Sequence, residues 1–320
     1  MVAEINVTSA EHVGFYEWPR TYRVGTGACG AHHGELFQGQ IYDQNGILRR
    51  CLMTLPCAGF RSKVTFYPEH GTELRVEPQR KKKAKRTVRL LLDSLGHEEL
   101  GGVLIVNDNI TEGKGYGSST SDCVAAARAA ADSLGVALRE DEIARIVVAA
   151  ETASDNTMFS NAALFAHREG IVLEHFTKSI PDIEMIGFDT EPDRRVDTLE
   201  YVPASYNWKD IQCLEIIVAA LRRAIQMQDR DLLGRVAQAS ADINQRFLPK
   251  PAYRELCSLS EQAGALGVAV AHSGTVASIL LDPFAEGSER RFDTLYRELE
   301  RLGFSDIRRF QTYRAQIRRT

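Results

Sequence analysis

Hydrophobic and polar residues alternate in short runs between residues 50 and 78, which predicts β-strands in this part of the chain. The runs at 62–67 and 74–76 both show this alternation. Residues 101–107, GGVLIVN, form an almost continuous apolar run, as expected for a buried strand. Two further apolar runs predict strands at 170–174 and 185–189.

Longer segments rich in helix-forming residues predict helices. Residues 80–95 combine a basic first half with an apolar end. Residues 122–134 are rich in alanine, which is the strongest helix former. Three further helices are expected, at 141–152, 213–226 and 231–244.

The last third of the chain has a regular order of predicted elements. These are a helix at 252–263, a strand at 267–271, a Gly-containing turn at 273–275, a strand at 276–281, a helix at 286–302 and a strand at 307–312. An order of helix, strand, strand, helix and strand predicts a split α/β sandwich with a largely antiparallel sheet.

The length of 320 residues is consistent with two domains of about 150 residues each. Residues 1–20 are polar and have no sustained period, so we expect an N-terminal extension there. Between residues 190 and 206 the composition shifts towards proline, aspartate and arginine, which indicates a connection. We therefore predict an N-terminal domain over 21–185 and a C-terminal domain over 186–320.

Composition and charge exclude several classes of function. Apolar residues make up 44% and charged residues 26%, as in an ordinary globular protein. The net charge of −4 gives no overall attraction to nucleic acid. No apolar stretch approaches the roughly 18 residues that span a bilayer, and the N-terminus lacks a basic region followed by an apolar one. The six cysteine residues include no Cys-x-x-Cys pair, so we expect free thiols and a cytoplasmic location.

The segment 113–121, GKGYGSSTS, lies between a predicted strand and a predicted helix. Its glycines allow the backbone to approach a ligand closely, and the free N–H groups of a first helical turn favour an anion. Hydroxyl groups and one lysine complete a set of donors suited to phosphate. A capped helix after a Gly-rich turn would contain the same residues, and neither Gly-x-x-x-x-Gly-Lys-[Ser/Thr] nor Gly-x-Gly-x-x-Gly is present.

This segment resembles the second motif of the GHMP kinases, a family that includes galactokinase, homoserine kinase and mevalonate kinase. The family pattern is Pro-x-x-x-Gly-Leu-[Gly/Ser]-Ser-Ser-[Ala/Ser]. Thr111 stands where the family has proline, and Tyr116 stands where it has leucine. Five residues fit the pattern: Gly115, Gly117, Ser118, Ser119 and Thr120.

Three other segments are similar to one branch of this family, the L-threonine kinases of cobalamin side-chain synthesis and propanediol utilisation. They are 34–39 (GELFQG), 244–251 (NQRFLPKP) and 271–275 (AHSGT). The branch has Pro-Gly-Thr-Cys before its Gly-Glu-Leu, whereas residues 27–33 here read GACGAHH. If that segment touches the acceptor, the substrate can differ from threonine.

The resemblance implies an α+β fold with two domains. The N-terminal one would be an α/β domain of the ribosomal-protein-S5-like type, and the C-terminal one a ferredoxin-like split α/β sandwich. ATP and Mg²⁺ are implied as cofactors. Binding of the ATP phosphates is implied for six residues: Gly113, Gly115, Gly117, Ser118, Ser119 and Thr120.

The family's metal ligands match Ser119 and Glu151, and one hydroxyl with one carboxylate suffices for Mg²⁺, which keeps several waters. Glu151 could equally be a solvated acid on a helix. Asp155 matches the aspartate of the branch's Glu-x-x-[Ser/Thr]-Asp and is the candidate base for the acceptor hydroxyl, with helix capping as the alternative. Lys114 is assigned a catalytic role beside the phosphates.

Acceptor binding is assigned to residues of two motifs. The first group is Glu35, Gln38 and His33, and the second is Ser273, Gly274 and Thr275. The first group would hold the acceptor; alternatively, it satisfies a turn and a strand edge. The second group would approach the acceptor or the γ-phosphate through backbone amides; alternatively, it forms a plain hairpin turn.

Two clusters suggest other binding functions. Residues 29–35 contain cysteine, two histidines and a glutamate, but no second group of ligands at zinc spacing supports a metal site there. The basic run at 81–86 is the one feature typical of nucleic-acid binding, and it lacks interleaved aromatic residues. We expect a solvated helix face at 81–86, with a place near a nucleotide entrance left open.

The sequence therefore predicts an ATP- and Mg²⁺-dependent kinase that phosphorylates the hydroxyl of L-threonine or a similar hydroxy-amino acid. One alternative keeps the fold and changes the acceptor to homoserine, an amino alcohol or a biosynthetic intermediate. Another is a non-catalytic regulator that binds a nucleotide or a metabolite. The expected partner is a small-molecule hydroxyl substrate, without nucleic acid or membrane, and a homodimer is left open.

Overall fold

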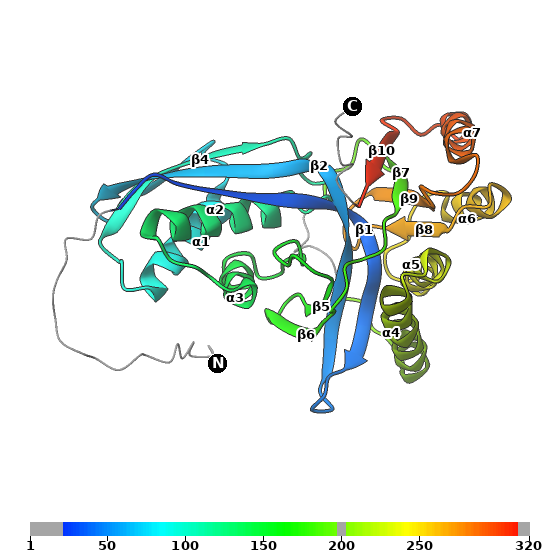
Figure 1. Ribbon diagram of the computed structural model, residues 1–320, viewed down its shortest axis with the longest axis horizontal. Coiled ribbons are helices and arrows are strands. Elements are labelled where there is room, and N and C mark those ends of the chain that lie inside the picture. The colour runs from blue at the N-terminus through cyan, green and yellow to red at the C-terminus, as the bar shows by residue number, and fades with distance from the viewer. Residues whose placement is uncertain (1–21, 197–202, 313–320) are drawn as a thin grey trace.

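The computed structural model describes residues 22–196 and 203–312, and the extension expected at 1–20 lies outside them. Two long strands, β1 (Gly25–Tyr42) and β2 (Leu48–His70), form an antiparallel hairpin that runs through both halves of the molecule (Figure 1). β4 (Leu100–Asp108) extends this hairpin next to β2, and β3 (Leu74–Glu77) pairs in parallel with β4.

The other end of the sheet is antiparallel throughout. Its order is β10 (Arg308–Gln311), β7 (Glu184–Asp189), β9 (Val276–Leu281) and β8 (Gly267–Val270). One residue pair, Glu35 with Val270, joins β8 to β1. Within the described residues, ten strands thus form one sheet.

The helices lie in two groups. α1 (Lys82–Ser94), α2 (Ser118–Leu134) and α3 (Glu140–Glu151) pack together against the N-terminal part of the sheet (Figure 1). The small strands β5 (Ala163–Ala166) and β6 (Ile171–His175) follow α3 and form a hairpin beside β2. The second group packs on the C-terminal half of the sheet: α4 (Trp208–Met227) on β1, α5 (Arg230–Asn244) on β1 and β8, α6 (Tyr253–Gln262) on β8 and α7 (Ser288–Arg301) on β7.

Two glycine residues of β1 explain how closely α2 packs on this strand. A Cβ atom at Gly25 would lie 2.1 Å from Ala129 O, and one at Gly27 would lie 2.1 Å from Ala125 O. Because these are backbone atoms of the helix, only glycine on the strand allows the two backbones this approach. The contact fixes the position of the helix N-terminus above β1.

The structure confirms the predicted order of helix, strand, strand, helix and strand in the last third, with the antiparallel sheet expected for it. The predicted boundary at 185/186 falls inside β7, which pairs with C-terminal strands on both sides. We therefore propose that the division lies before Glu184. Within the described part of the chain, no helix is long and apolar enough to cross a membrane.

Candidate functional site

A cavity of about 340 Å³ opens where the N-terminus of α2 meets the C-terminal half of the sheet. Its walls come from the loop before α2, the segment after α3, the turn between β5 and β6, and the loop between β8 and β9. Together with β1 and the end of α3, these segments contribute eleven residues to which the sequence assigned a role: Glu35, Gly113, Gly115, Gly117, Ser118, Ser119, Thr120, Glu151, Asp155, Ser273 and Gly274.

The loop before α2 and the loop before β9 are pressed together. Gly115 has a φ of +96°, and a Cβ atom there would lie 2.7 Å from the Cα of Gly274. Lys114 O accepts a hydrogen bond from Thr275 N at 2.9 Å. The helix itself begins at Ser118, four residues earlier than expected, so Ser118, Ser119 and Thr120 occupy its first turn. Their free N–H groups make this helix start suited to an anion.

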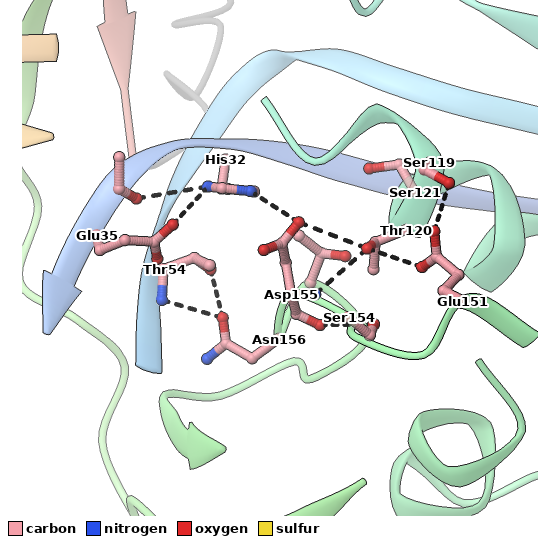
Figure 2. Close-up of polar contacts among 12 residues, drawn as sticks. His32, Glu35, Thr54, Ser119, Thr120, Ser121, Glu151, Ser154, Asp155 and Asn156 are labelled. Carbon is pink, nitrogen blue, oxygen red and sulfur yellow. Dashed lines mark hydrogen bonds and ion pairs between the residues drawn. The ribbon is translucent and has the colours of Figure 1, made fainter. Parts of the chain in front are cut away.

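Ser119 and Glu151 lie side by side at this helix start. Ser119 donates a hydrogen bond to Glu151 Oε1 (Figure 2), and the Glu151 residue is 3% exposed. Burial raises the pKa of Glu151 to about 7, and the nearest cation, Lys83 Nζ, is 3.7 Å from its carboxylate. A buried carboxylate and a hydroxyl next to an anion site fit the oxygen ligands that Mg²⁺ prefers.

Thr120 links the Glu151 carboxylate to that of Asp155. The Oγ1 atom of Thr120 lies 3.0 Å from Glu151 Oε2 and 3.4 Å from Asp155 Oδ2, and it accepts a hydrogen bond from Asp155 N at 3.3 Å (Figure 2). Asp155 follows α3 by four residues because Thr152 ends the helix with a φ of +76°. The candidate metal ligand and the candidate base are therefore held by one hydroxyl.

On the other side of Asp155 lies His32, which reaches the cavity from β1. Its Nε2 is 3.1 Å from Asp155 Oδ2, and its Nδ1 is 3.7 Å from Glu35 Oε1 (Figure 2). Burial lowers the pKa of His32, but the two carboxylates more than offset this and raise it to about 9. Burial also raises the pKa of Asp155, yet the charge of His32 holds it below its ordinary value. At neutral pH the pair is thus imidazolium and carboxylate.

The three side chains His32, Glu35 and Asp155 each offer one potential ligand atom, and these atoms lie within 4.8 Å of one another. Burial raises the pKa of Glu35 to about 8. His32 Nε2 is in ion-pair contact with Asp155 and its Nδ1 lies 3.4 Å from Gly34 O, so the cluster is already organised without a metal as an ion pair with a neutral acid beside it. Ser119 with Glu151 is the better candidate metal site.

Four predicted site residues lie elsewhere. His33 is fully buried between the rings of Tyr116 and Phe310, on the far side of β1 from His32, because successive strand residues point to opposite faces. The Lys114 ammonium contacts Asp189 Oδ2 at 2.7 Å and three backbone carbonyls of residues 191–194. This geometry does not favour acceptor binding by His33 or catalysis by Lys114.

Gln38 and Thr275 also lie outside the cavity lining. Gln38 Oε1 is 2.5 Å from Nδ1 of His272, and its backbone carbonyl accepts a hydrogen bond from Asn244. Gln38 therefore positions His272, which does line the cavity. Thr275 is buried, and its backbone carbonyl accepts a hydrogen bond from the Thr190 hydroxyl.

Sequence reasoning missed several cavity residues. His32 belongs to the segment that departs from the L-threonine kinase pattern, and this departure was the available signal. Lys83 belongs to the basic run, which was expected to be solvated; in that run Lys81 is buried against Asp108 and Asp122. His167 and Arg168 carried no motif and reach the cavity through the β5–β6 turn.

Two family models match the chain. The family model described as GHMP kinases N terminal domain matches residues 82–168, and that described as GHMP kinases C terminal matches residues 217–302. Together the matches cover more than half of the chain.

Two curated L-threonine kinases are similar in sequence. The protein of Citrobacter freundii is 32% identical over 184 residues, which are 55% of this chain and 61% of that protein. The protein of Salmonella typhimurium is 31% identical over 178 residues, which are 55% of this chain and 59% of that protein. The chain thus matches about 60% of the length of these relatives.

Solved structures resemble the whole fold. A homoserine kinase from Cytophaga hutchinsonii superimposes with a TM-score of 0.65 at 14% identity, covering 93% of this chain and 97% of that one. Mevalonate kinase of L. major, solved with R-mevalonate, gives a TM-score of 0.59 at 16% identity, covering 92% and 97%. The structure of MDDEF in complex with MVAPP, AMPPCP and magnesium gives 0.60 at 17% identity, covering 90% and 97%. At these identities the likeness establishes the fold.

Proposed function

The chain belongs to the GHMP kinase family, and we propose that it transfers the γ-phosphate of ATP to the side-chain hydroxyl of L-threonine or a similar hydroxy-amino acid. One observation carries the proposal. Thr120 lies between the Glu151 and Asp155 carboxylates within one cavity, at the start of a helix suited to phosphate. The groups for holding the donor and for orienting the acceptor are therefore adjacent.

The donor end is formed by α2 and its preceding loop. Backbone N–H groups of the first helical turn would bind the phosphates, and Lys83 supplies a cation at their entrance. Ser119 and Glu151 would hold Mg²⁺ through one hydroxyl and one carboxylate oxygen. When bound, Mg²⁺ neutralises charge on the transferred phosphoryl group.

Asp155 would accept a hydrogen bond from the acceptor hydroxyl and aim its oxygen at the γ-phosphorus. The acceptor oxygen then forms a bond to that phosphorus, the bond between the phosphorus and its bridging oxygen breaks, and ADP leaves with the electron pair. The hydroxyl proton passes to Asp155. His32 keeps Asp155 ionised and fixed, since its Nε2 lies 3.1 Å from the carboxylate. Phosphoryl transfer depends chiefly on such positioning and charge.

The choice of a hydroxy-amino acid is supported by the two L-threonine kinase relatives and by the mixed charges of the cavity. A second acceptor class has one observation in its favour: His32 lies in the segment 27–33, which departs from the pattern of those relatives. Homoserine and amino alcohols therefore belong in the test. A cytoplasmic location is part of the proposal, and all six cysteine residues are unpaired.

The test measures phosphate transfer from ATP with Mg²⁺ to L-threonine, L-serine, L-homoserine and simple amino alcohols, with products identified by mass. Turnover on L-threonine well above that on the other acceptors supports the proposal. Turnover on another hydroxy-amino acid retains the reaction and changes the substrate. Binding of ATP without transfer to any acceptor overturns the proposal and favours a regulatory protein.

A further inference from the structure

Several side chains that line the cavity have buried polar atoms without hydrogen-bond partners among the described residues. His167 is 3% exposed and neither ring nitrogen has a partner among the described residues; Glu35 is 2% exposed and the same holds for both of its carboxylate oxygens. The Nε of Arg168 is also buried without a partner in the described part of the chain. Buried polar groups in native proteins are nearly always hydrogen-bonded, so three exceptions around one cavity indicate a ligand with matching groups.

These three side chains differ in their charge at pH 7. Arg168 brings a permanent cation into the wall, and burial together with neighbouring positive charges lowers the pKa of His167 to about 3. The ring of His272 packs against that of His167 at 5.4 Å, and burial lowers its pKa to about 4. Both imidazoles are thus neutral at pH 7 and can serve as hydrogen-bonding groups beside the guanidinium. Glu35, on β1, lines the same cavity and is a neutral acid at pH 7.

The backbone fixes the distance between this cation and the candidate base. His167 and Arg168 form the turn directly after β5, and β5 pairs with β2 at Leu52, another cavity residue. His167 O accepts a hydrogen bond from Ser154 N at 2.9 Å, and Ser154 precedes Asp155. A ligand that contacts both the turn and Asp155 is therefore small.

We propose that the turn of His167 and Arg168 recognises a carboxylate of the acceptor, while the carbonyl oxygen of the neutral Glu35 carboxyl accepts a hydrogen bond from the acceptor's ammonium group. The inference rests on the proposed function and adds to it that the acceptor is an α-amino acid whose carboxylate is required. Arginine pairs with carboxylates through two parallel hydrogen bonds, which provides both affinity and orientation. An acceptor without a carboxylate leaves Arg168 unpaired inside the cavity and is rejected for that reason.

The test compares Arg168→Gln and Arg168→Lys with wild type on L-threonine, on L-threoninol, which lacks the carboxylate, and on glycerol 3-phosphate. Arg75→Gln, an exposed arginine paired with Glu69 on the far side of the sheet, is the control. We expect Arg168→Gln to lower kcat/KM for L-threonine roughly 10²-fold and that for L-threoninol less than about 3-fold. Arg168→Lys should retain part of the preference for L-threonine over L-threoninol, because lysine keeps the positive charge.

Equal losses on L-threonine and L-threoninol, or no loss on either, overturn the inference. If Arg168→Gln loses activity on glycerol 3-phosphate alone, the turn recognises a phosphate group, and this result also overturns the inference. Equilibrium binding of L-threonine and L-threoninol in the presence of a non-hydrolysable ATP analogue separates the two proposals. A carboxylate preference in binding without transfer contradicts the proposed function alone, whereas transfer without that preference contradicts this inference alone.

Discussion

His32 Nε2 lies 3.1 Å from Asp155 Oδ2, and this contact joins β1 to the segment that follows α3. A Cβ atom at Gly117 would lie 2.5 Å from His32 Cδ2, so the ring is also packed against the residue that precedes α2. One imidazole therefore touches two of the segments that form the site. Its charge and its shape both contribute to the position of the Asp155 carboxylate.

The charge of His32 predicts a shift in the pH dependence of activity. His32 lowers the pKa of Asp155, so His32→Gln raises it. The acid limb of kcat/KM against pH should move to higher pH, as expected when an opposite charge at this distance is lost. The control is His175→Gln, whose exposed ring pairs with Asp141 away from the cavity. An unchanged acid limb in His32→Gln would show that the imidazolium does not act on Asp155.

The same pair predicts a pH-dependent contribution to stability. The pKa of His32 rises from 6.5 to about 9 on folding, so its charged form stabilises the folded state below pH 6.5, and this contribution is lost as the pH rises through 9. The difference in unfolding free energy between wild type and His32→Gln should fall from at most roughly 3 kcal/mol at pH 6 towards zero at pH 9.5. Urea denaturation at four pH values measures it. A difference in unfolding free energy that increases with pH would contradict this prediction.

Ser119 and Glu151 should both be needed for Mg²⁺-dependent turnover. We expect Ser119→Ala and Glu151→Gln to lower kcat by roughly 10²-fold or more, because the first removes an oxygen ligand and the second replaces a charged carboxylate by a neutral amide. The Mg²⁺ concentration for half-maximal rate should rise in both, while circular dichroism spectra stay unchanged. Ser258→Ala, on the exposed face of α6, serves as the control. Wild-type kinetics in both site variants contradict the metal assignment.

The contact between Gly115 and Gly274 should be sensitive to a single methyl group. In Gly115→Ala the new Cβ would lie 2.7 Å from the Gly274 Cα, at a φ of +96°. We expect about 1–3 kcal/mol of destabilisation and at least a tenfold loss of ATP affinity, measured by thermal unfolding and calorimetry. Gly59→Ala is a matched control, since its φ is +105° and nothing lies within 4 Å. If the two variants lose stability and ATP affinity equally, the positive φ alone is responsible and the contact with Gly274 is not.

The sequence was informative where local chemistry determines structure. Alternation and helix-forming composition located most elements, and the Gly/Ser motif located the start of α2 to within four residues. β1 was not predicted, because its glycine residues weaken the strand signal, and two of them, Gly25 and Gly27, are explained by the approach of α2. Likewise, β5 is four residues long and depends on pairing with distant β2.

The candidate site was predictable only in part, because it too depends on contacts between segments that are distant in the sequence. Residues in one motif share a loop or a helical turn, so Ser119 and Thr120 were found together. Which face of β1 points to the cavity depends on register, and a shift of one residue separates His32 in the cavity from His33 in the core. Arg168 reaches the cavity from a turn whose position depends on the tertiary fold.

The most direct test of the central claim compares wild type with Asp155→Asn in a single turnover of bound ATP with Mg²⁺ and L-threonine. The account predicts one O-phospho-amino acid per ADP in the wild type. The variant should bind ATP with unchanged affinity and form the product roughly 10²-fold or more slowly, as expected for loss of an acid–base group. Equal rates in the two proteins, or ADP formed without a phosphorylated acceptor, would contradict the account.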